Sequence, residues 1–120
     1  MEKVKIYMSI NEIKQQFEHC HVVGVEVSTA KIGADPSVLH VAFDWSPQSL
    51  VYRCFFSISK CCDRSGFRVR LFGEEVESEF VRRQFSIDSE VDDNWINSFD
   101  LPVFISKLLF FAKVPKKPRR

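Results

Sequence analysis

The hydrophobic pattern at the start of the chain predicts a short strand followed by a short helix. Residues 3–8 alternate between polar and apolar positions, as expected for a strand that buries one face. Ser9 and Glu12 have the spacing of a capping box, in which each side chain accepts a hydrogen bond from the other residue's backbone N–H. A short amphipathic helix is therefore expected over residues 10–19. Its apolar side chains are Ile10, Ile13 and Phe17.

Period-two alternation then predicts four strands joined by short turns. These strands are expected over residues 21–29, 38–45, 50–58 and 67–71. Consecutive strands with short connections pair as an antiparallel meander. The side chains expected to point inward are Val23, Val25, Val27, Leu39, Val41, Phe43, Trp45, Leu50, Tyr52, Cys54, Phe56, Ile58, Phe67, Val69 and Leu71.

The strand expected over residues 50–58 differs from its neighbours because both of its faces carry apolar side chains. Val51 and Phe55 point away from the main apolar face of this strand. A strand that is apolar on both faces is typical of the middle of a sheet covered on both sides. We therefore expect it to be central and covered on both faces.

Residues 74–85 allow two interpretations. Glutamates near the start and arginines near the end suit the macrodipole of a helix, which is the interpretation we favour. Val81, Phe85 and Ile87 are evenly spaced, and this spacing suits a strand instead.

The last apolar segment predicts a helix and completes the expected fold. Pro102 suits the first turn of a helix that runs to about Lys113. This helix is apolar nearly all round, so it must be buried in its own domain or against a partner. We predict one α+β domain over residues 1–112, with an antiparallel sheet of four to five strands. The order is strand–helix–four strands, then one or two helices, packed mainly on one face. Residues 113–120 are expected to form a flexible basic tail.

Composition adds a compartment and an aromatic core to this picture. Twelve phenylalanines among 120 residues imply a core rich in aromatic rings. The N-terminus lacks the uninterrupted apolar block of a secretory signal, and Leu101–Ala112 is too short to span a membrane. Free thiols in a cytoplasmic protein are the expected state of the cysteines. They are Cys20, Cys54, Cys61 and Cys62.

Charge is strongly segregated along the chain, although the formal net charge is only +1. Residues 74–100 hold nine acidic residues and two arginines, whereas residues 101–120 hold six basic residues and no acid. So dense an acidic segment repels itself unless something compensates it. The basic tail could fold back over it, or a basic partner could cover it.

The acidic segment motivates our first functional hypothesis, a small inhibitor of the immunity or antitoxin type. Carboxylates would cover the cationic active cleft of a basic, nuclease-like toxin, and Trp95 would act as the buried anchor. The residues expected to bind the partner are Glu74, Glu75, Glu77, Glu79, Asp88, Glu90, Asp92, Asp93 and Trp95. The competing explanation is a solvated acidic surface that keeps a small protein soluble.

The alternative hypothesis is a nucleic-acid-binding accessory protein. Arg68 and Arg70 share one face of a strand with Phe72, and the tail over residues 113–120 is strongly basic. Lysine and arginine side chains bind nucleic acid by neutralising phosphates.

Catalytic and metal chemistry find little support in the sequence, and we expect no enzyme, cofactor, metal or membrane partner. His19, Cys20 and His21, with the pair Cys61 and Cys62, form the only cluster of metal-ligand type, and they lack zinc-site spacing. A small hydrolase that uses His19, His21 or His40 is the third and weakest hypothesis.

Overall fold

The chain folds as one helix, five consecutive strands and two further helices. The computed structural model describes residues 2–76 and 83–112, with side chains from residue 9 onward. In chain order the elements are α1 (Glu2–Glu18), β1 (Val25–Ile32), β2 (Val38–Trp45), β3 (Tyr52–Lys60), β4 (Phe67–Glu75), β5 (Gln84–Val91), α2 (Asp93–Asn97) and α3 (Leu101–Ala112). The predicted α+β class with a single antiparallel sheet is confirmed.

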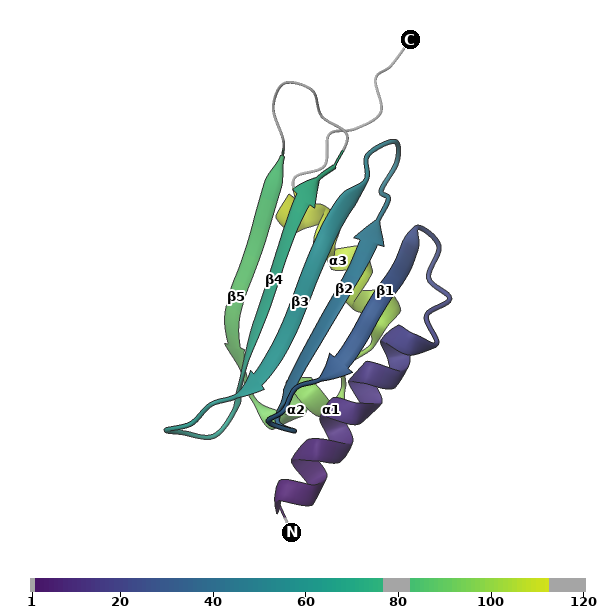
Figure 1. Ribbon diagram of the computed structural model, residues 1–120. Helices are drawn as coiled ribbons and strands as arrows, with labels where there is room; N and C mark the ends of the chain where they lie inside the picture. Colours follow the sequence, from purple (N-terminus) through teal and green to yellow (C-terminus); the bar gives the residue numbers. More distant parts are fainter. Residues whose placement is uncertain (1, 77–82, 113–120) are drawn as a thin grey trace.

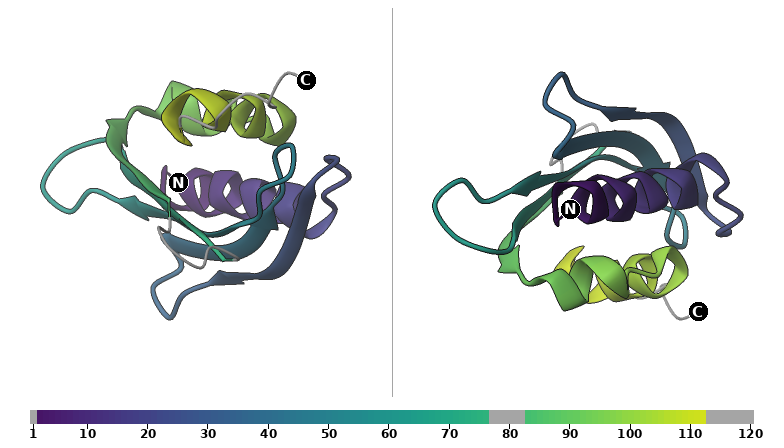
Figure 2. Two further views of the ribbon diagram at one scale, coloured as in Figure 1. Left: turned by 90° about the horizontal axis from the view of Figure 1, so that it is seen from above. Right: turned by 90° about the horizontal axis from the view of Figure 1, so that it is seen from below.

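The sheet is a simple meander. Each strand pairs antiparallel with the next one in the chain, so the spatial order is β1-β2-β3-β4-β5 (Figure 1). The sheet curves, and α1 and α3 both lie on its inner side (Figure 2). α1 packs on β1 and β2, while α3 packs on β5. The predicted placement of the helices on one face of the sheet is therefore confirmed.

Aromatic rings join the helices to the inner face of the sheet. Phe17 of α1 lies with its ring centroid 5.8 Å from that of Phe43 and 5.2 Å from that of Phe56. Phe56 also contacts Phe104 of α3, with 5.2 Å between centroids. These side chains form the predicted aromatic core, because they lie where the helices and the sheet meet.

A glutamine fixes α1 against the start of α3. The Gln16 side-chain N–H donates to the backbone carbonyl of Phe99 at 2.8 Å, and the Leu101 backbone N–H donates to Gln16 Oε1 at 2.9 Å. This side chain therefore satisfies backbone groups at a helix start that would otherwise need another partner. The two hydrogen bonds set how the helices lie side by side.

The strand predicted over residues 3–8 is wrong, because α1 already begins at Glu2. Six alternating residues are too few to distinguish the two-residue period of a strand from the 3.6-residue period of a helix. Apolar residues at 6, 10, 13 and 17 continue one helical repeat through the segment, and that repeat prevails. Ser9 consequently lies inside the helix and donates to Asn97 Oδ1 at 2.9 Å, rather than capping the N-terminus.

The second expected strand begins later than predicted. Val23 was expected to point inward, but it is 97% exposed because it lies in the connection before β1. Gly24 follows with a φ of 83°, a left-handed conformation that glycine adopts without strain. The chain turns at this glycine and enters the sheet at Val25.

The prediction of a helix over residues 74–85 is wrong, because both ends of this segment belong to strands. Glu74 and Glu75 close β4, and Gln84 and Phe85 open β5. The strand interpretation was correct for Phe85, which is buried on the inner face. Pairing with β4 decides the outcome here, and local charge at the helix ends could not reveal it. Residues 77–82 lie outside the described part of the chain.

The last helix is confirmed, and it has two unlike faces. Its buried side faces the core, while its opposite side exposes large apolar residues. The buried residues are Leu101, Ile105, Leu108 and Ala112, and the exposed ones are Val103, Leu109, Phe110 and Phe111. Among the described residues, no helix has the length and apolar character needed to span a membrane.

Candidate functional site

The side of the sheet that points away from the helices is not covered by any described element. Strand alternation places every second side chain there. We call this surface the open face. Its side chains include Glu26, Thr29, Lys31, His40, Ala42, Asp44, Arg53, Phe55, Ser57, Arg68, Arg70, Phe72, Glu74, Gln84, Ser86, Asp88 and Glu90.

A row of small and aromatic residues crosses the middle of the open face. Thr29, Ala42, Phe55, Phe72 and Ser86 are successive register partners from β1 to β5. Phe55 and Phe72 lie directly opposite each other on β3 and β4, and their side chains are 52% and 39% exposed. Two large apolar side chains therefore stand side by side in solvent at the centre of the sheet.

The expectation that this strand is covered on both sides is therefore wrong. Helices cover only the inner face of β3 (Figure 2), and Phe55 of the outer face stays exposed. The amino-acid pattern could not distinguish an aromatic side chain kept for packing from one left in solvent.

A hollow of about 300 Å³ adjoins Phe55 on the open face. Thr29, His40, Ala42 and Ser57 contribute to its lining. Ala42 has no side chain beyond Cβ, so it leaves a depression between the longer residues around it.

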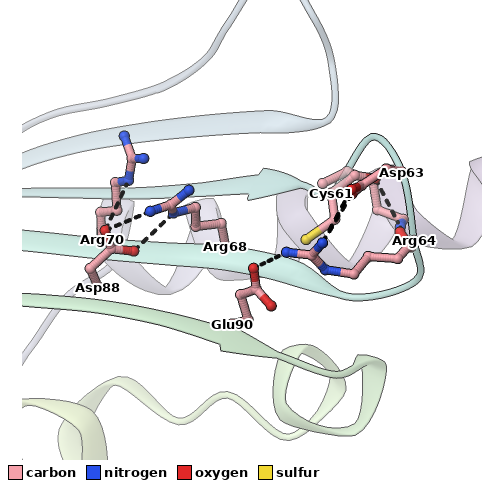
Figure 3. A network of polar contacts seen from close by, with 8 residues as sticks. Cys61, Asp63, Arg64, Arg68, Arg70, Asp88 and Glu90 are labelled. Atoms are coloured by element: carbon pink, nitrogen blue, oxygen red, sulfur yellow. Dashed lines mark hydrogen bonds and ion pairs between the residues drawn. The ribbon is translucent and has the colours of Figure 1, made fainter.

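Arginines of β4 and carboxylates of β5 form paired charges beside this row (Figure 3). Arg68 donates two hydrogen bonds to Asp88, at 2.9 Å from Nε and 2.8 Å from Nη2, and Arg70 Nε lies 3.7 Å from the same carboxylate. Arg64 in the β3–β4 turn pairs with Glu90. The acidic segment is therefore partly compensated by the neighbouring strand of its own sheet.

These pairs change the acidity of their members. The hydrogen bonds from Arg68 lower the pKa of Asp88, and partial desolvation of the carboxylate opposes that change. The hydrogen bond to Asp88 likewise raises the pKa of Arg68. Both groups consequently remain charged over a wider pH range than they would alone.

The other flank of the aromatic row is also charged. Arg53 Nε lies 3.5 Å from Asp44 Oδ1 on β2. Glu74, the register partner of Arg53, accepts a hydrogen bond of 3.2 Å from the Gln84 side chain. Residues of both signs thus border Phe55 and Phe72 on this side as well.

Of the remaining predicted partner-binding glutamates, the structure describes one that lies away from the open face. Glu75 points to the inner side of the sheet and is buried, where it accepts a hydrogen bond of 3.2 Å from the Arg83 backbone N–H. Its carboxylate also lies 3.6 Å from Arg83 Nη1. Glu77 and Glu79 lie outside the described residues.

Asp92, Asp93 and Trp95 belong to the junction between β5 and the helices. Asp92 caps α2, because its carboxylate accepts a hydrogen bond of 3.0 Å from the Trp95 backbone N–H. The Trp95 ring packs against the rings of Phe99 and Phe104, with centroids 5.4 and 6.4 Å away. The predicted anchor is thus half-buried in the helical layer, away from the open face.

Three of the predicted carboxylates do meet at one hollow. Glu90, Asp92 and Asp93 line a depression of about 300 Å³ together with Ser65 and Gly66 of the β3–β4 turn. It lies where β5 ends and α2 begins. The predicted set therefore divides between the open face, the inner face and this junction.

The residues of the nucleic-acid hypothesis do share one surface. Arg68, Arg70 and Phe72 alternate along β4 and lie on the open face, as predicted. Both guanidinium groups are engaged by Asp88. The basic tail, residues 113–120, lies outside the described part of the chain.

The histidines and cysteines do not come together. His19 and His21 are exposed in the α1–β1 connection, whereas Cys61 and Cys62 lie in the β3–β4 turn at the far side of the sheet (Figure 1). In residues 2–76 and 83–112, no three His, Cys, Asp or Glu side chains are placed to hold a metal ion. All four cysteines are free thiols, and burial raises the pKa of Cys54 to about 12.

Comparison of this chain with protein-family models, with curated proteins and with solved structures finds no match. Roles for its residues therefore rest on their own geometry.

Proposed function

We propose that this chain is a protein-binding domain that contacts its partner through the open face, with Phe55 and Phe72 as the central contacts. The exposure of these two aromatic side chains, side by side on an uncovered sheet, is the observation that supports the proposal. Protein interfaces are enriched in aromatic and arginine side chains, and a few such residues supply most of the binding energy.

The surroundings of the two phenylalanines fit a protein interface. Charged and polar residues border them on both flanks, and such a rim excludes water from a central apolar contact. The hollow beside Phe55 would receive an apolar side chain of the partner. Arg53 and Arg70 would then pair with acidic groups that approach from the partner side.

Charge favours a protein partner over nucleic acid. The charged residues of the open face are Lys31, Arg53, Arg68 and Arg70 against Glu26, Asp44, Glu74, Asp88 and Glu90. Four basic and five acidic residues leave this surface without the positive field that phosphate binding requires. A partner that itself carries both signs of charge suits it better.

Inhibition of a basic, nuclease-like toxin is a more specific form of the same proposal. The hollow lined by Glu90, Asp92 and Asp93 adjoins the end of the open face and would receive a lysine or arginine of such a partner. Asp93 lies exposed at that hollow, whereas Glu90 would have to exchange Arg64 for a residue of the toxin.

The test uses the tagged chain, expressed in its own host and purified with whatever it binds. We expect one protein at near-stoichiometric amount, whose binding to the purified chain is then measured by calorimetry. Phe55→Ser combined with Phe72→Ser should weaken that binding about thirtyfold or more, the effect expected when central aromatic contacts are lost.

Phe110→Ser is the matched control, because it removes an exposed phenylalanine far from the open face and should leave this affinity unchanged. Equal loss in the control, or full binding by the double variant, would contradict the proposal. Recovery of nucleic acid alone, lost at high salt, would support the accessory-protein hypothesis in its place.

A further inference from the structure

The aromatic row of the open face separates two rows of unlike charge. The register partners on one side of Phe55 and Phe72 include three acidic residues and one arginine, and we call them the acidic flank. Those on the other side include two basic residues and one aspartate, and we call them the basic flank. The acidic flank consists of Glu26, Asp44, Arg53, Glu74 and Gln84, and the basic flank of Lys31, His40, Ser57, Arg70 and Asp88. The next row beyond the basic flank pairs Arg68 with Glu90 and adds no net charge.

The shape of the open face confines contact with a second sheet to its middle. The sheet curves around the helices, so the open face is its convex side (Figure 2). Two convex surfaces touch mainly at their centres, and here the central aromatic side chains belong to β3 and β4. Phe72 of β4 lies between Glu74 of the acidic flank and Arg70 of the basic flank, each two residues away. Opposite charges therefore stand on the two sides of the central aromatic contact.

A second copy of the chain matches this pattern when a two-fold axis runs along the aromatic row. The rotation lays each phenylalanine on its own equivalent, and it lays the acidic flank of one copy over the basic flank of the other. Glu74 would then face Arg70 of the second copy, and Glu26 would face Lys31 of the second copy. The strands of the two copies would be aligned, as is usual when sheets pack face to face.

The same charges disfavour other ways of covering the open face. A two-fold axis along the strands would lay each flank on itself, so that carboxylates would meet carboxylates and like charges would repel. A partner that carries one sign of charge would be attracted by one flank and repelled by the other. Only a surface with the same division of charge, in the reverse order, complements both flanks.

The two side chains that would meet at the centre can bind more than one group. Glu74 accepts a hydrogen bond of 3.2 Å from Gln84, and an ionised carboxylate has two oxygens that accept several bonds. Arg70 Nε lies 3.7 Å from Asp88, and this arginine side chain is 57% exposed. A guanidinium group has five N–H donors, so contact with Asp88 leaves donors for a second copy.

We propose that a second copy of this chain binds the open face, with the two-fold axis along the aromatic row. The proposal rests on the function proposed above, because it names one partner of the same surface. The four basic and five acidic residues of the open face nearly cancel, so two copies do not repel each other as a whole. Contact confined to the middle of a convex sheet buries a small area, and such interfaces associate weakly and reversibly. The open face therefore stays accessible to another protein.

The experiment is sedimentation velocity of the full chain over a wide range of protein concentration. We expect an equilibrium of monomer and dimer without larger species, because a two-fold interface closes on itself. Phe55→Ser combined with Phe72→Ser should weaken the association at least about tenfold, since both central aromatic contacts are lost. Phe110→Ser is the matched control, because it removes an exposed phenylalanine of α3, and it should leave the association unchanged.

Charge reversals test how the two copies are oriented. Arg70→Glu places a carboxylate opposite Glu74 of the second copy, and Glu74→Arg places a guanidinium group opposite Arg70 of the second copy. Each variant alone should associate at least about fivefold more weakly than wild type at low salt. An equimolar mixture of the two variants should regain the association, because the carboxylates of one variant then face the guanidinium groups of the other. Recovery in the mixture would also show that both variants are folded.

Three results would overturn the proposal. They are a chain that stays monomeric at every concentration, a dimer that is lost in Phe110→Ser but kept in the double variant, and a mixture that associates no better than the single variants. Failure of the function proposed for the open face would be distinct, because the double variant would then bind the host protein fully. A monomeric wild-type chain that binds another protein through Phe55 and Phe72 would overturn self-association alone.

Discussion

Phe55 and Phe56 are neighbours in β3 and yet occupy opposite environments. Phe56 is 1% exposed and its ring contacts Phe17, Phe99 and Phe104. Phe55 points to the open face and is half exposed. The same pair of environments recurs on β4, where Leu71 is buried and Phe72 exposed. Two helices cover one side of this sheet, and nothing described covers the other.

This difference separates the side chains that stabilise the fold from those to which we assign partner binding. A side chain buried among aromatic rings stabilises the fold through the apolar area that it removes from water. An exposed phenylalanine contributes little of that kind, so its presence in the middle of an uncovered surface needs another reason. The inner face holds the domain together, and the open face is available to bind.

The largest expected effect tests this comparison directly. Phe56→Ala should lower the free energy of unfolding by about 3–5 kcal/mol, because it leaves a cavity among several rings. Phe55→Ala should lower it by less than about 1 kcal/mol. Urea unfolding of the two variants, followed by fluorescence, measures both values. Similar losses in the two variants would show that Phe55 is also a core residue.

A second, smaller effect concerns a glycine on the inner face. A Cβ added at Gly73 would clash with Cε1 of Phe85, whose ring covers this glycine from the neighbouring strand. Gly73→Ala should therefore displace Phe85 and lower the free energy of unfolding by about 1–3 kcal/mol. Chemical denaturation measures the loss.

Gly33→Ala provides the control for that prediction. A Cβ at Gly33 would meet its nearest atoms at 3.6 to 3.7 Å, an ordinary contact distance. This variant should unfold close to the wild-type midpoint. A wild-type midpoint for Gly73→Ala as well would mean that Phe85 moves aside without cost.

The sequence predicted the meander and the last helix because each has a sustained period. Leu39 to Trp45 alternates without interruption, and the strand found there has the predicted bounds. Residues 3–8 were misassigned because the segment is too short to show the helical repeat that it shares with residues 10–17, and residues 74–85 because strand pairing decides the ends of that segment. The strand pairing that places Phe85 over Gly73 is not visible in local propensity.

The candidate site was harder to predict than the fold. The density of negative charge suggested residues 74–100 as the binding site, but strand alternation in the sheet places these acidic side chains on different surfaces. Asp88 is hydrogen-bonded to Arg68, whereas Glu75 is buried. Phe55 was expected to be covered, since sequence alone does not show which face the helices cover, and Phe72 was noted only for sharing a strand face with Arg68 and Arg70. What could have identified them is the polar residues two positions away on the same strand face, which are Arg53 and Ser57 around Phe55 and Arg70 and Glu74 around Phe72.

The third prediction concerns the contribution to stability of the N-terminal cap of α2, at the junction between β5 and the helices. Asp92→Ala removes the acceptor that caps α2 and should lower the free energy of unfolding by about 1 kcal/mol. Asp92→Asn keeps an acceptor at the same place and should recover most of that loss. Thermal unfolding of the three proteins provides the comparison, and equal melting temperatures would show that the cap is dispensable.

The smallest expected effect concerns the paired charges of the open face. Hydrogen bonds from Arg68 lower the pKa of Asp88 in the folded protein. A carboxyl group with a lowered pKa stabilises the fold above its unfolded pKa, and this stabilisation is lost as the pH falls through the folded value. Asp88→Asn should therefore be less stable than wild type near neutral pH, and the difference should shrink below about pH 4.

NMR titration of the Asp88 side chain checks the cause, and Arg68→Gln should move its pKa back toward that of a free aspartate. Because these groups are exposed, the difference in stability should also shrink in salt. An unchanged Asp88 titration in Arg68→Gln would mean that the pair does not persist in solution. Arg68 would then be free for a partner, and the open face would be more basic toward that partner than its paired charges imply.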